Sequence, residues 1–327
     1  MKRRWASLTL TAWGVCSLHI VRGPRASAKG CDLASFELLE PRSLGEAFAL
    51  LDSDDPAVRP FGGGTALMLM MKAQIFKPVR LVSLRLLGGP LHGIELAADK
   101  SAFRIGAMTT FAELEHSPDI RAHLPVVTQT MLTLANVRVR NVATIGGNLA
   151  HGDPHLDLPP VWTALDAKVR IASKAGERTI PVQELFAGYY ETTLKHGEII
   201  TGIDVPVRPK WTSHYAKVTT RAQHDWPALG LAVSAQFDGK RINDIRVVLS
   251  AAVDRPSRLK GAEAVLRGAE IDDAVLSRAA DAALGEVHIE SDLRGSADYK
   301  QHLLRVHLGR AVKALSPRGD QATIQRA

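Results

Sequence analysis

Cysteine is almost absent from this chain of 327 residues, which contains only Cys16 and Cys31. Two cysteines cannot form a disulfide framework, and the sequence has no cysteine cluster that could hold an iron–sulfur centre. Aromatic residues are scarce at 5%, whereas hydrophobic residues make up 46% and charged residues 23% of the chain. This composition excludes disordered, collagen-like, coiled-coil and polytopic membrane proteins, and the length predicts about two domains.

Acidic residues are missing from the first 30 positions, which contain six of the 41 lysines and arginines. The remaining chain has 35 basic and 34 acidic side chains, so the formal net charge of +7 belongs almost entirely to the N-terminus. A nearly neutral body lacks the basic surface of a nucleic-acid-binding protein. No nucleic-acid partner is therefore predicted.

Residues 1–33 form a leader with a basic start, a mostly apolar run over 6–21 and the sequence Ala26-Ser27-Ala28. This order is typical of a secretory signal, and Arg3-Arg4 is compatible with twin-arginine export. The alternative is an over-extended gene start or a disordered leader. Polar residues interrupt the apolar run, so no stable membrane insertion is expected. A cytoplasmic location is predicted, or a periplasmic one if residues 1–28 act as an export signal.

The body of the chain divides into three blocks, followed by a tail at 317–327 without apolar periodicity. The first block, 34–84, has the pattern of a β-α-β-α-β unit. The second block, 85–208, begins with a hairpin and continues with helices, a glycine-rich loop and two strands. The third block, 209–316, has three strand-like runs followed by three helical ones, which predicts a three-stranded antiparallel sheet with helices. The fold class predicted is therefore α+β.

The limits expected for these elements follow from their patterns. In the first block, strands are expected at 36–39, 58–61 and 79–84, with helices at 43–51 and 65–72. In the second block, we expect strands at 93–97, 102–107, 168–172 and 199–205, helices at 111–116, 124–135 and 161–165, and a loop over 140–160. In the third block, strands are expected at 215–219, 229–237 and 243–251, and helices at 259–267, 273–284 and 298–314.

A first glycine-rich segment, Pro60-Phe61-Gly62-Gly63-Gly64-Thr65, lies between a predicted strand and a predicted helix. Glycines permit positive φ and leave backbone N–H groups accessible to an anion such as phosphate. A tight strand-to-helix turn is the simpler explanation, although it rarely needs three glycines. No Gly-Lys-[Ser/Thr] follows, which excludes a P-loop, and Leu67 stands where the Rossmann fingerprint requires its third glycine.

A second segment runs from Arg140 to Asn148 with the sequence RNVATIGGN. Thr144 and Asn148 offer polar side chains on either side of two glycines, whose amides are expected to be free. Two such segments about 80 residues apart are suited to the two halves of a pyrophosphate. They predict a dinucleotide that is bound in a fold other than the Rossmann fold.

The segments FGGGTALMLMMK, RNVATIGGN and HLDLPP resemble the FAD-binding medium subunit of the molybdenum hydroxylases. This family includes carbon monoxide dehydrogenase, xanthine dehydrogenase and aldehyde oxidoreductases. The similarity continues through FAGYY at 186–190 and SDLRGSADY at 291–299, and it covers almost everything after the leader.

The resemblance implies a two-lobed FAD-binding domain of the vanillyl-alcohol-oxidase (PCMH) type and a small C-terminal α+β domain. It implies that both glycine segments hold the FAD pyrophosphate, and that Asp157 binds the ribityl or flavin region. Lys217, with Arg221 near it in sequence, would lie beside the isoalloxazine, and Tyr190 or Tyr189 would cover the flavin. The implied FAD-binding residues are Pro60, Phe61, Gly62, Gly63, Gly64, Thr65, Ala66, Thr144, Ile145, Gly146, Gly147, Asn148, Asp157, Tyr190 and Lys217.

The same resemblance implies a role in electron transfer with no catalytic residue of its own. FAD would be bound non-covalently. Molybdopterin and [2Fe-2S] clusters would be held by partners, a large molybdopterin-binding subunit and a small iron–sulfur subunit. Two alternatives are a self-contained flavin oxidase and an assembly factor that has lost FAD. Arg138 and Arg140 could contact either a phosphate or a partner subunit.

One departure from the family pattern is the alternation His151, Asp153, His155 and Asp157. In an extended strand these four side chains would share one face and could chelate a metal. Gly152 and Pro154 instead favour a loop, and the family binds no metal at this position. No metal site is therefore predicted.

Overall fold

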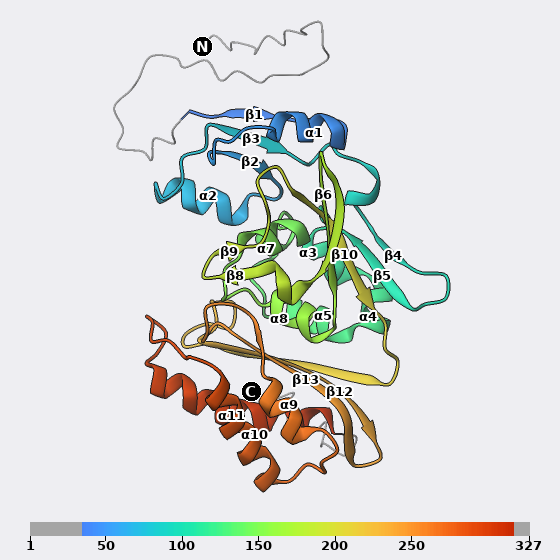
Figure 1. Ribbon diagram of the computed structural model, residues 1–327, viewed down its shortest axis with the longest axis vertical. Helices are drawn as coiled ribbons and strands as arrows, with labels where there is room; N and C mark the ends of the chain where they lie inside the picture. The colour runs from blue at the N-terminus through green and yellow to red at the C-terminus, as the bar shows by residue number, and fades with distance from the viewer. Residues whose placement is uncertain (1–34, 317–327) are drawn as a thin grey trace, which may run out of the picture.

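The computed structural model describes residues 35–316 and arranges them as an elongated molecule of stacked lobes (Figure 1). The predicted leader and tail lie outside the described residues. Among the residues described, no helix has the length and apolar character needed to cross a bilayer.

The first lobe is a three-stranded parallel sheet in the order β1-β3-β2 with two helices. The side chain of Ser43 accepts a hydrogen bond from the N–H of Glu46 and so begins the first helix. The elements of this lobe are β1 (Glu37–Leu39), α1 (Leu44–Leu51), β2 (Val58–Phe61), α2 (Thr65–Lys72) and β3 (Arg80–Ser83).

The second lobe is built on a five-stranded antiparallel sheet in the order β4-β5-β10-β6-β7. Its strands are β4 (Ile94–Leu96), β5 (Ala102–Gly106), β6 (Lys168–Ser173), β7 (Gly176–Pro181) and β10 (Ile199–Pro206), with a small ribbon of β8 (Phe186–Gly188) and β9 (Glu191–Thr192). Its helices are η1 (Gly89–Leu91), α3 (Phe111–His116), α4 (Pro118–His123), α5 (Pro125–Met131), α6 (Val137–Arg140), α7 (Ile145–His151), α8 (Leu158–Ala164) and η2 (Val182–Leu185).

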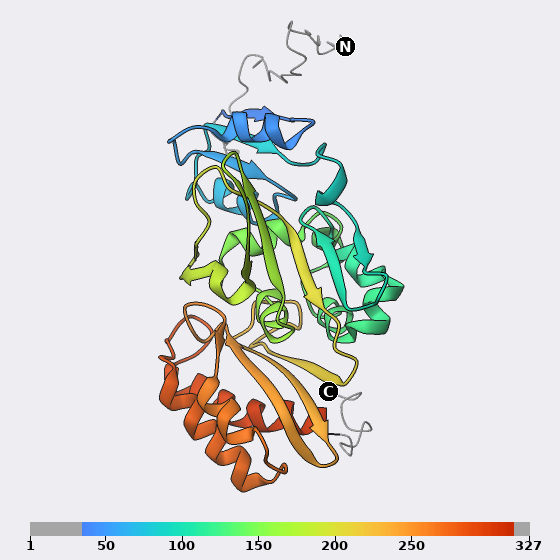
Figure 2. The ribbon, with the colours of Figure 1, turned by 45° about the vertical axis from the view of Figure 1, so that its right-hand side comes forward.

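The C-terminal lobe is an antiparallel sheet in the order β11-β12-β13-β14, with helices on the face that is turned away from the other lobes (Figure 2). Its elements are β11 (Trp211–Val218), β12 (Leu229–Asp238), β13 (Arg241–Ser250), β14 (Ser257–Arg258), α9 (Lys260–Leu266), α10 (Asp273–Glu286) and α11 (Ala297–Leu315). The predicted number of three strands was wrong, because a fourth strand, the two-residue β14, pairs with β13. Two residues are too few to show an alternating pattern.

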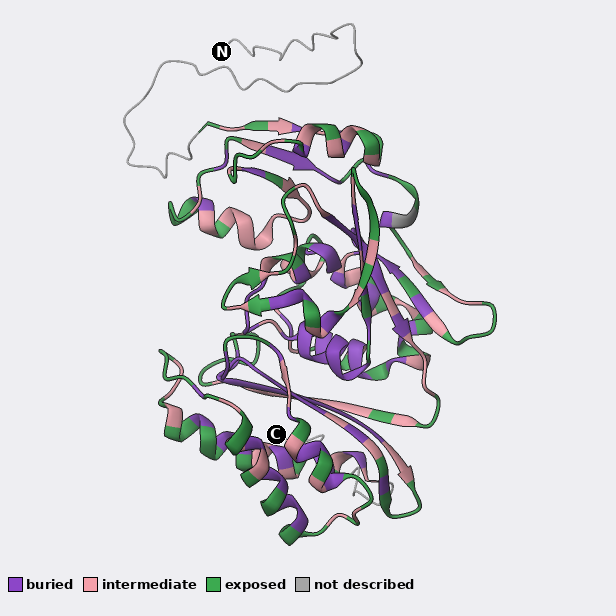
Figure 3. Ribbon diagram, in the orientation of Figure 1, coloured by how far each residue is buried: buried purple, intermediate pink, exposed green. Residues whose placement is uncertain are grey.

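Helix α8 connects the second lobe to the C-terminal sheet. All its residues are buried (Figure 3), which is typical of a helix enclosed in a core. Ala232 and Val248 of the sheet join the core of the second lobe, whereas Leu231 and Val233 join the core formed with α9–α11. Because successive side chains of a strand alternate between faces, both faces of the central strands β12 and β13 are buried.

The loop predicted over 140–160 instead contains helix α7 and the start of α8. Thr144 begins α7 by accepting a hydrogen bond from the N–H of Gly147, and Gly152 ends it at φ +69°. Two glycines lower helix propensity, which explains the error. Helix α5 ends at Met131 rather than near 135, and β7 was not predicted.

Candidate functional site

The two glycine-rich segments lie against each other. A side-chain carbon on Gly63 would be 1.7 Å from the carbonyl oxygen of Val142, and one on Gly62 would be 2.9 Å from Oγ1 of Thr144. Only glycine permits backbones to approach so closely. The strand-to-helix turn after β2 and the start of α7 therefore form one continuous wall.

The first glycine segment presents free backbone donors. Gly64 adopts a left-handed conformation with φ +72°, just before α2 begins at Thr65. Within residues 35–316, no acceptor is found for the N–H groups of Gly63, Gly64 and Thr65. Three such donors beside a helix start are suited to an anionic group.

The second segment differs from the expectation of free amides. The N–H groups of Ile145, Gly146 and Gly147 donate to oxygens of the protein itself, at 3.0, 2.7 and 3.2 Å. The group of this segment that remains available to a ligand is the side chain of Asn148, since its Oδ1 is buried without a partner in the described structure. A ligand donor would satisfy this oxygen, whose unpaired burial is otherwise costly.

Asp157 is the centre of a buried polar network that joins the second and C-terminal lobes. Its two carboxylate oxygens accept hydrogen bonds from the hydroxyl of Tyr215 at 2.8 Å and from Nζ of Lys217 at 2.9 Å. Nζ of Lys217 also donates to the carbonyl oxygen of Thr133 at 2.9 Å. Burial raises the pKa of Asp157, although the Lys217 ammonium and the Tyr215 hydroxyl oppose that shift.

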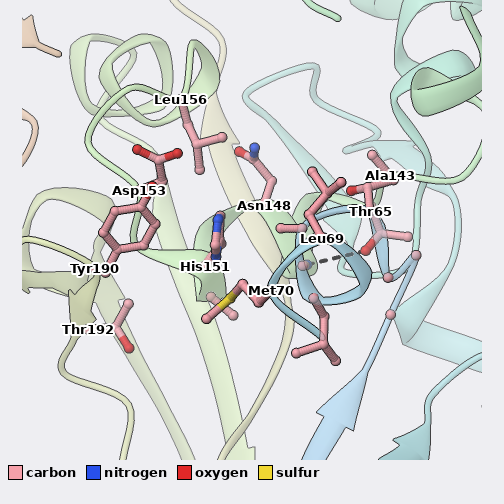
Figure 4. A pocket seen from close by; sticks show the side chains of 18 of the residues that line it. Thr65, Leu69, Met70, Ala143, Asn148, His151, Asp153, Leu156, Tyr190 and Thr192 are labelled. Atoms are coloured by element: carbon pink, nitrogen blue, oxygen red, sulfur yellow. Dashed lines mark hydrogen bonds between the residues drawn. The ribbon is translucent and has the colours of Figure 1, made fainter. Parts of the chain in front are cut away.

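Aromatic rings gather on the other side of the site, where Tyr190 stands beside Asp153 and His151 (Figure 4). The ring of Tyr190 contacts those of His151 and Tyr189 edge-on, with centroids 5.2 and 4.9 Å away. Burial raises the pKa of Tyr190, and the Asp153 carboxylate adds to that shift, so the phenol stays neutral. Trp226, which is 51% exposed, completes this aromatic group.

These features surround one cavity of about 720 Å³, which is within the range of about 300–1,000 Å³ usual for small-molecule sites. Thirteen of the fifteen residues named from the resemblance line it: Pro60, Phe61, Gly62, Gly63, Gly64, Thr65, Ala66, Thr144, Gly147, Asn148, Asp157, Tyr190 and Lys217. Ile145 and Gly146 are not in its wall. Both are buried, and a side-chain carbon on Gly146 would lie 2.7 Å from Cβ of Ala107.

Several wall residues were not predicted as ligands. Among them are Arg59, His151, Asp153, His155, Trp226 and the segment 194–198. Three of them, His151, Asp153 and His155, belong to the His/Asp alternation, which was considered only as a metal site. Its members diverge, because Asp157 bonds to Lys217 while Asp153 bonds to His155. Across residues 35–316 no group of three or more metal-ligating side chains is arranged to hold an ion.

Two arginines that were considered for cofactor or partner binding are paired with other groups of the protein. Arg140 bonds to Glu115 at 2.9 Å and to the carbonyl oxygens of Leu134 and Ala135, so it stabilises the turn before α6. Arg221 has an 86% exposed side chain paired with Asp225. Arg138 is exposed and remains available for a partner.

The arrangement suits a dinucleotide that carries a flavin. Free amides of the first glycine segment line one part of the cavity, Oδ1 of Asn148 is buried without a partner in the described structure, and the ring of Tyr190 stands at the opposite side. These groups offer acceptors for hydroxyl or imide donors and apolar faces for a planar ring.

Two family profiles match the chain. One, described as the FAD binding domain in molybdopterin dehydrogenase, matches residues 34–208, and the other, the CO dehydrogenase flavoprotein C-terminal domain, matches residues 214–315.

Individual proteins are similar over the same range. The carbon monoxide dehydrogenase medium chain of Hydrogenophaga pseudoflava is 33% identical, over 85% of this chain and 96% of the relative. The nicotine 6-hydroxylase medium subunit of Paenarthrobacter nicotinovorans is 32% identical, over 86% and 97%. Among solved structures, the Hydrogenophaga pseudoflava carbon monoxide dehydrogenase matches with a TM-score of 0.82 and 34% identity, over 86% of this chain and 96% of that one.

Structural likeness extends to enzymes that are named for other substrates. Quinoline 2-oxidoreductase from Pseudomonas putida 86 matches with a TM-score of 0.80 and 28% identity, over 87% of this chain and 98% of that one. The predicted α+β FAD-binding fold is confirmed. This chain therefore belongs to the FAD-binding medium subunits of the molybdenum hydroxylase family, and it is the FAD-binding subunit of an oxidoreductase.

Proposed function

We propose that this chain is the electron-transfer subunit of a heteromeric molybdenum hydroxylase. It would accept electrons from partner subunits and pass them through FAD to an external acceptor. The observation that carries this proposal is the single cavity that combines both glycine segments, the Asp157–Lys217 pair and the aromatic group. FAD supplies the redox chemistry, while the protein binds and orients it.

The FAD would be bound non-covalently with its pyrophosphate against Gly63, Gly64 and Thr65, where free amides stabilise negative charge. Asn148 would accept a hydrogen bond from the cofactor through Oδ1. The ribityl or flavin portion would lie beside Asp157 and Lys217, and Tyr190 would cover it. No cysteine other than Cys16 and Cys31 exists in the chain, which supports placing iron–sulfur clusters and molybdopterin on other subunits.

The partners would be a small iron–sulfur subunit and a large molybdopterin-binding subunit. Relatives named as medium chains of carbon monoxide dehydrogenase support a multi-subunit enzyme. The segment after α5 exposes Leu132, Val137 and Val142 at 64%, 59% and 49%, close to wall residues Leu134 and Val139. We call these three side chains the α6 apolar surface. Apolar groups exposed near a redox site fit a protein contact, and Arg138 beside them would add a charge.

We place the complex in the cytoplasm. The export-signal alternative depends on residues 1–28, which lie outside the described residues.

The test is to purify the chain alone and identify its cofactor after acid release. We expect FAD at about one per chain, together with reversible chemical reduction and no turnover with aldehydes, purines or carbon monoxide. Release of FMN, or a folded protein that binds no flavin, would contradict the proposal. Substrate oxidation by a preparation free of iron and molybdenum would instead favour a self-contained oxidase.

A further inference from the structure

His155 is held between oppositely charged groups in the wall of the cavity. The ring is almost completely buried, with 7% of the side chain exposed. Its Nδ1 lies 2.9 Å from Oδ1 of Asp153, which also accepts the backbone N–H of His155 at 2.9 Å. The Asp153 carboxylate also interacts with the phenol of Tyr190, and both Asp153 and His155 line the cavity.

The second ring nitrogen has two competing neighbours. Nε2 of His155 lies 3.4 Å from Oδ2 of Asp292 and 3.4 Å from Nη1 of Arg294. A carboxylate only accepts and a guanidinium only donates. Neutral His155, with its proton on Nδ1, can therefore accept from Arg294, whereas protonated His155 can donate to Asp292. Each protonation state has a partner already in place.

The surroundings are balanced in charge and connected to the surface. Asp292 is 27% exposed on its side chain and forms an ion pair with Nζ of buried Lys300 at 3.0 Å. The charged and titratable groups that face the imidazole are Asp153, Asp292, Arg294, Lys300 and Tyr189, with His151 and Tyr190 next to Asp153. With neutral His155, the two carboxylates and the two cations cancel. An added negative charge in the cavity would therefore favour the protonated ring.

The position of this cluster within the cavity indicates which part of the ligand it faces. Tyr190 and Trp226 line the same cavity as Asp153 and His155 and are 42% and 51% exposed, and Tyr190 lies beside Asp153 (Figure 4). Arg294 also stacks on Trp226, with the guanidinium carbon 5.3 Å from the ring centre. The proposed function places the pyrophosphate at the glycine segments and the flavin beside Asp157, Lys217 and Tyr190, so the flavin is the part of FAD nearest to this cluster.

We infer that His155 is a redox-linked proton site, which takes up one proton when FAD in the cavity is reduced by two electrons and releases it on reoxidation. This inference rests on the proposed function. With FAD bound, two electrons from the iron–sulfur subunit and one proton taken up by the cofactor would leave one added negative charge in the cavity. A second proton from solvent converts neutral His155 to the cation and exchanges its Nε2 partner from Arg294 to Asp292. Both protons return to solvent when the external acceptor removes the two electrons. His155 thus balances the added charge through its own protonation, and it is a positioning residue rather than a catalytic one.

The test counts protons from the pH dependence of the FAD midpoint potential, using full-length wild type and the variant His155→Gln. Glutamine keeps a donor for Asp153 but cannot titrate. Near neutral pH, we expect wild type to take up more protons per two electrons than His155→Gln does. The difference should approach one proton. The variant His307→Gln, at a half-buried histidine of α11, should match wild type. Equal proton counts for wild type and His155→Gln would overturn the inference.

A second measurement needs no variant. In ¹⁵N-histidine NMR spectra at one pH, Nε2 of His155 should be unprotonated in the oxidised protein and protonated in the reduced protein. The same protonation state in both would overturn the inference. A protein that holds FAD but shows no redox-linked proton at His155 contradicts this inference alone, whereas a protein that holds no FAD contradicts the proposed function as well.

Discussion

The contact between Gly63 and Val142 makes the site sensitive to a single methyl group. We predict that Gly63→Ala loses FAD at least tenfold more readily, because its Cβ would lie 1.7 Å from the Val142 carbonyl oxygen and force the glycine segments apart. Such a clash costs on the order of 1–3 kcal/mol of folding free energy, so the protein should still fold. Bound FAD after gel filtration measures the effect.

The matched control is Gly45→Ala in α1, where a Cβ would meet nothing within 4 Å. It should retain FAD and gain roughly 0.5–1 kcal/mol of stability, because alanine is the better helix former. Equal FAD retention in the two variants would show that the approach of the two segments is not needed for binding.

Lys217 is predicted to stabilise the fold through Asp157. Lys217→Met leaves a buried carboxylate with only Tyr215 as partner, and breaking such a pair costs about 3–5 kcal/mol. Asp157→Asn combined with Lys217→Met should recover part of this loss, as measured by urea unfolding. A double variant less stable than Lys217→Met would contradict the pairing.

The pH dependence of the Lys217→Met defect follows from the pKa of Asp157. Burial raises this pKa in the folded state, so ionisation costs the folded state more than the unfolded state. Removing the Lys217 ammonium, which opposes the shift, should raise this pKa further, so the defect should grow as pH rises from the folded pKa of wild type to that of the variant. It should shrink when acid protonates Asp157.

Individual site residues differ in how far sequence could identify them. Motif resemblance named Asp157 and Lys217, but their bond joins residues 60 positions apart and cannot be read from spacing. Trp226 is an isolated aromatic in a loop, without a periodic pattern to mark it. His155 was noticed as a metal candidate, and its true neighbours, Asp292 and Arg294, come from the other end of the chain.

At the scale of elements, periodic segments were predicted well and glycine-rich ones were not. Strands β2 and β12 and helices α10 and α11 lie within a few residues of their expected limits. Helix α7 was taken for a loop because its glycines have low intrinsic propensity, which the Thr144 cap and contacts with Ala107 override.

The segment 194–198 of the cavity wall is held to β7 by one ion pair. Arg178 donates to both carboxylate oxygens of Glu198 at 2.8 and 2.7 Å, and these bonds lower the Glu198 pKa. A depressed carboxyl pKa stabilises the fold above the unfolded value of about 4.3, and that stabilisation is lost as pH falls through the folded pKa. We predict that Glu198→Gln costs about 1–2 kcal/mol at pH 7.

Thermal unfolding at several pH values tests this role of Glu198. The difference in stability between wild type and Glu198→Gln should narrow as pH falls below about 4.3. A difference that is constant with pH would mean that the charge of Glu198 does not matter.

The α6 apolar surface is predicted to bind the iron–sulfur subunit. Val137→Glu should weaken co-purification with that subunit at least tenfold, because a carboxylate would be buried at an apolar contact. Val79→Glu is the matched control, since Val79 is 57% exposed, against 59% for Val137, and precedes β3 in the first lobe. FAD content should be unchanged in both variants, and equal partner recovery would place the interface elsewhere.

At the scale of the whole molecule, the C-terminal lobe contributes to the cavity rather than standing apart from it. Its central strands β12 and β13 are buried on both faces, and Lys217 of β11 and Trp226 of the loop that follows β11 line the cavity. The order of the third block, three strands and then three helices, predicted an α+β lobe with helices on one face of its sheet. Burial of the other face could not be predicted, because that face packs against α8. Only 161–165 of this region was expected to be helical.

Anaerobic reduction of FAD by substrate tests the central claim most directly. The chain would be compared alone and after co-expression with its large and small partner subunits, with the flavin absorbance followed after substrate is added. We predict that FAD is reduced only in the complex, which should contain molybdenum and iron. A complex built with Gly63→Ala should still reduce its iron–sulfur clusters, whereas its flavin signal should fall in proportion to the FAD that it has lost. FAD reduction by substrate in the isolated chain, or none in a complete complex, would contradict the account.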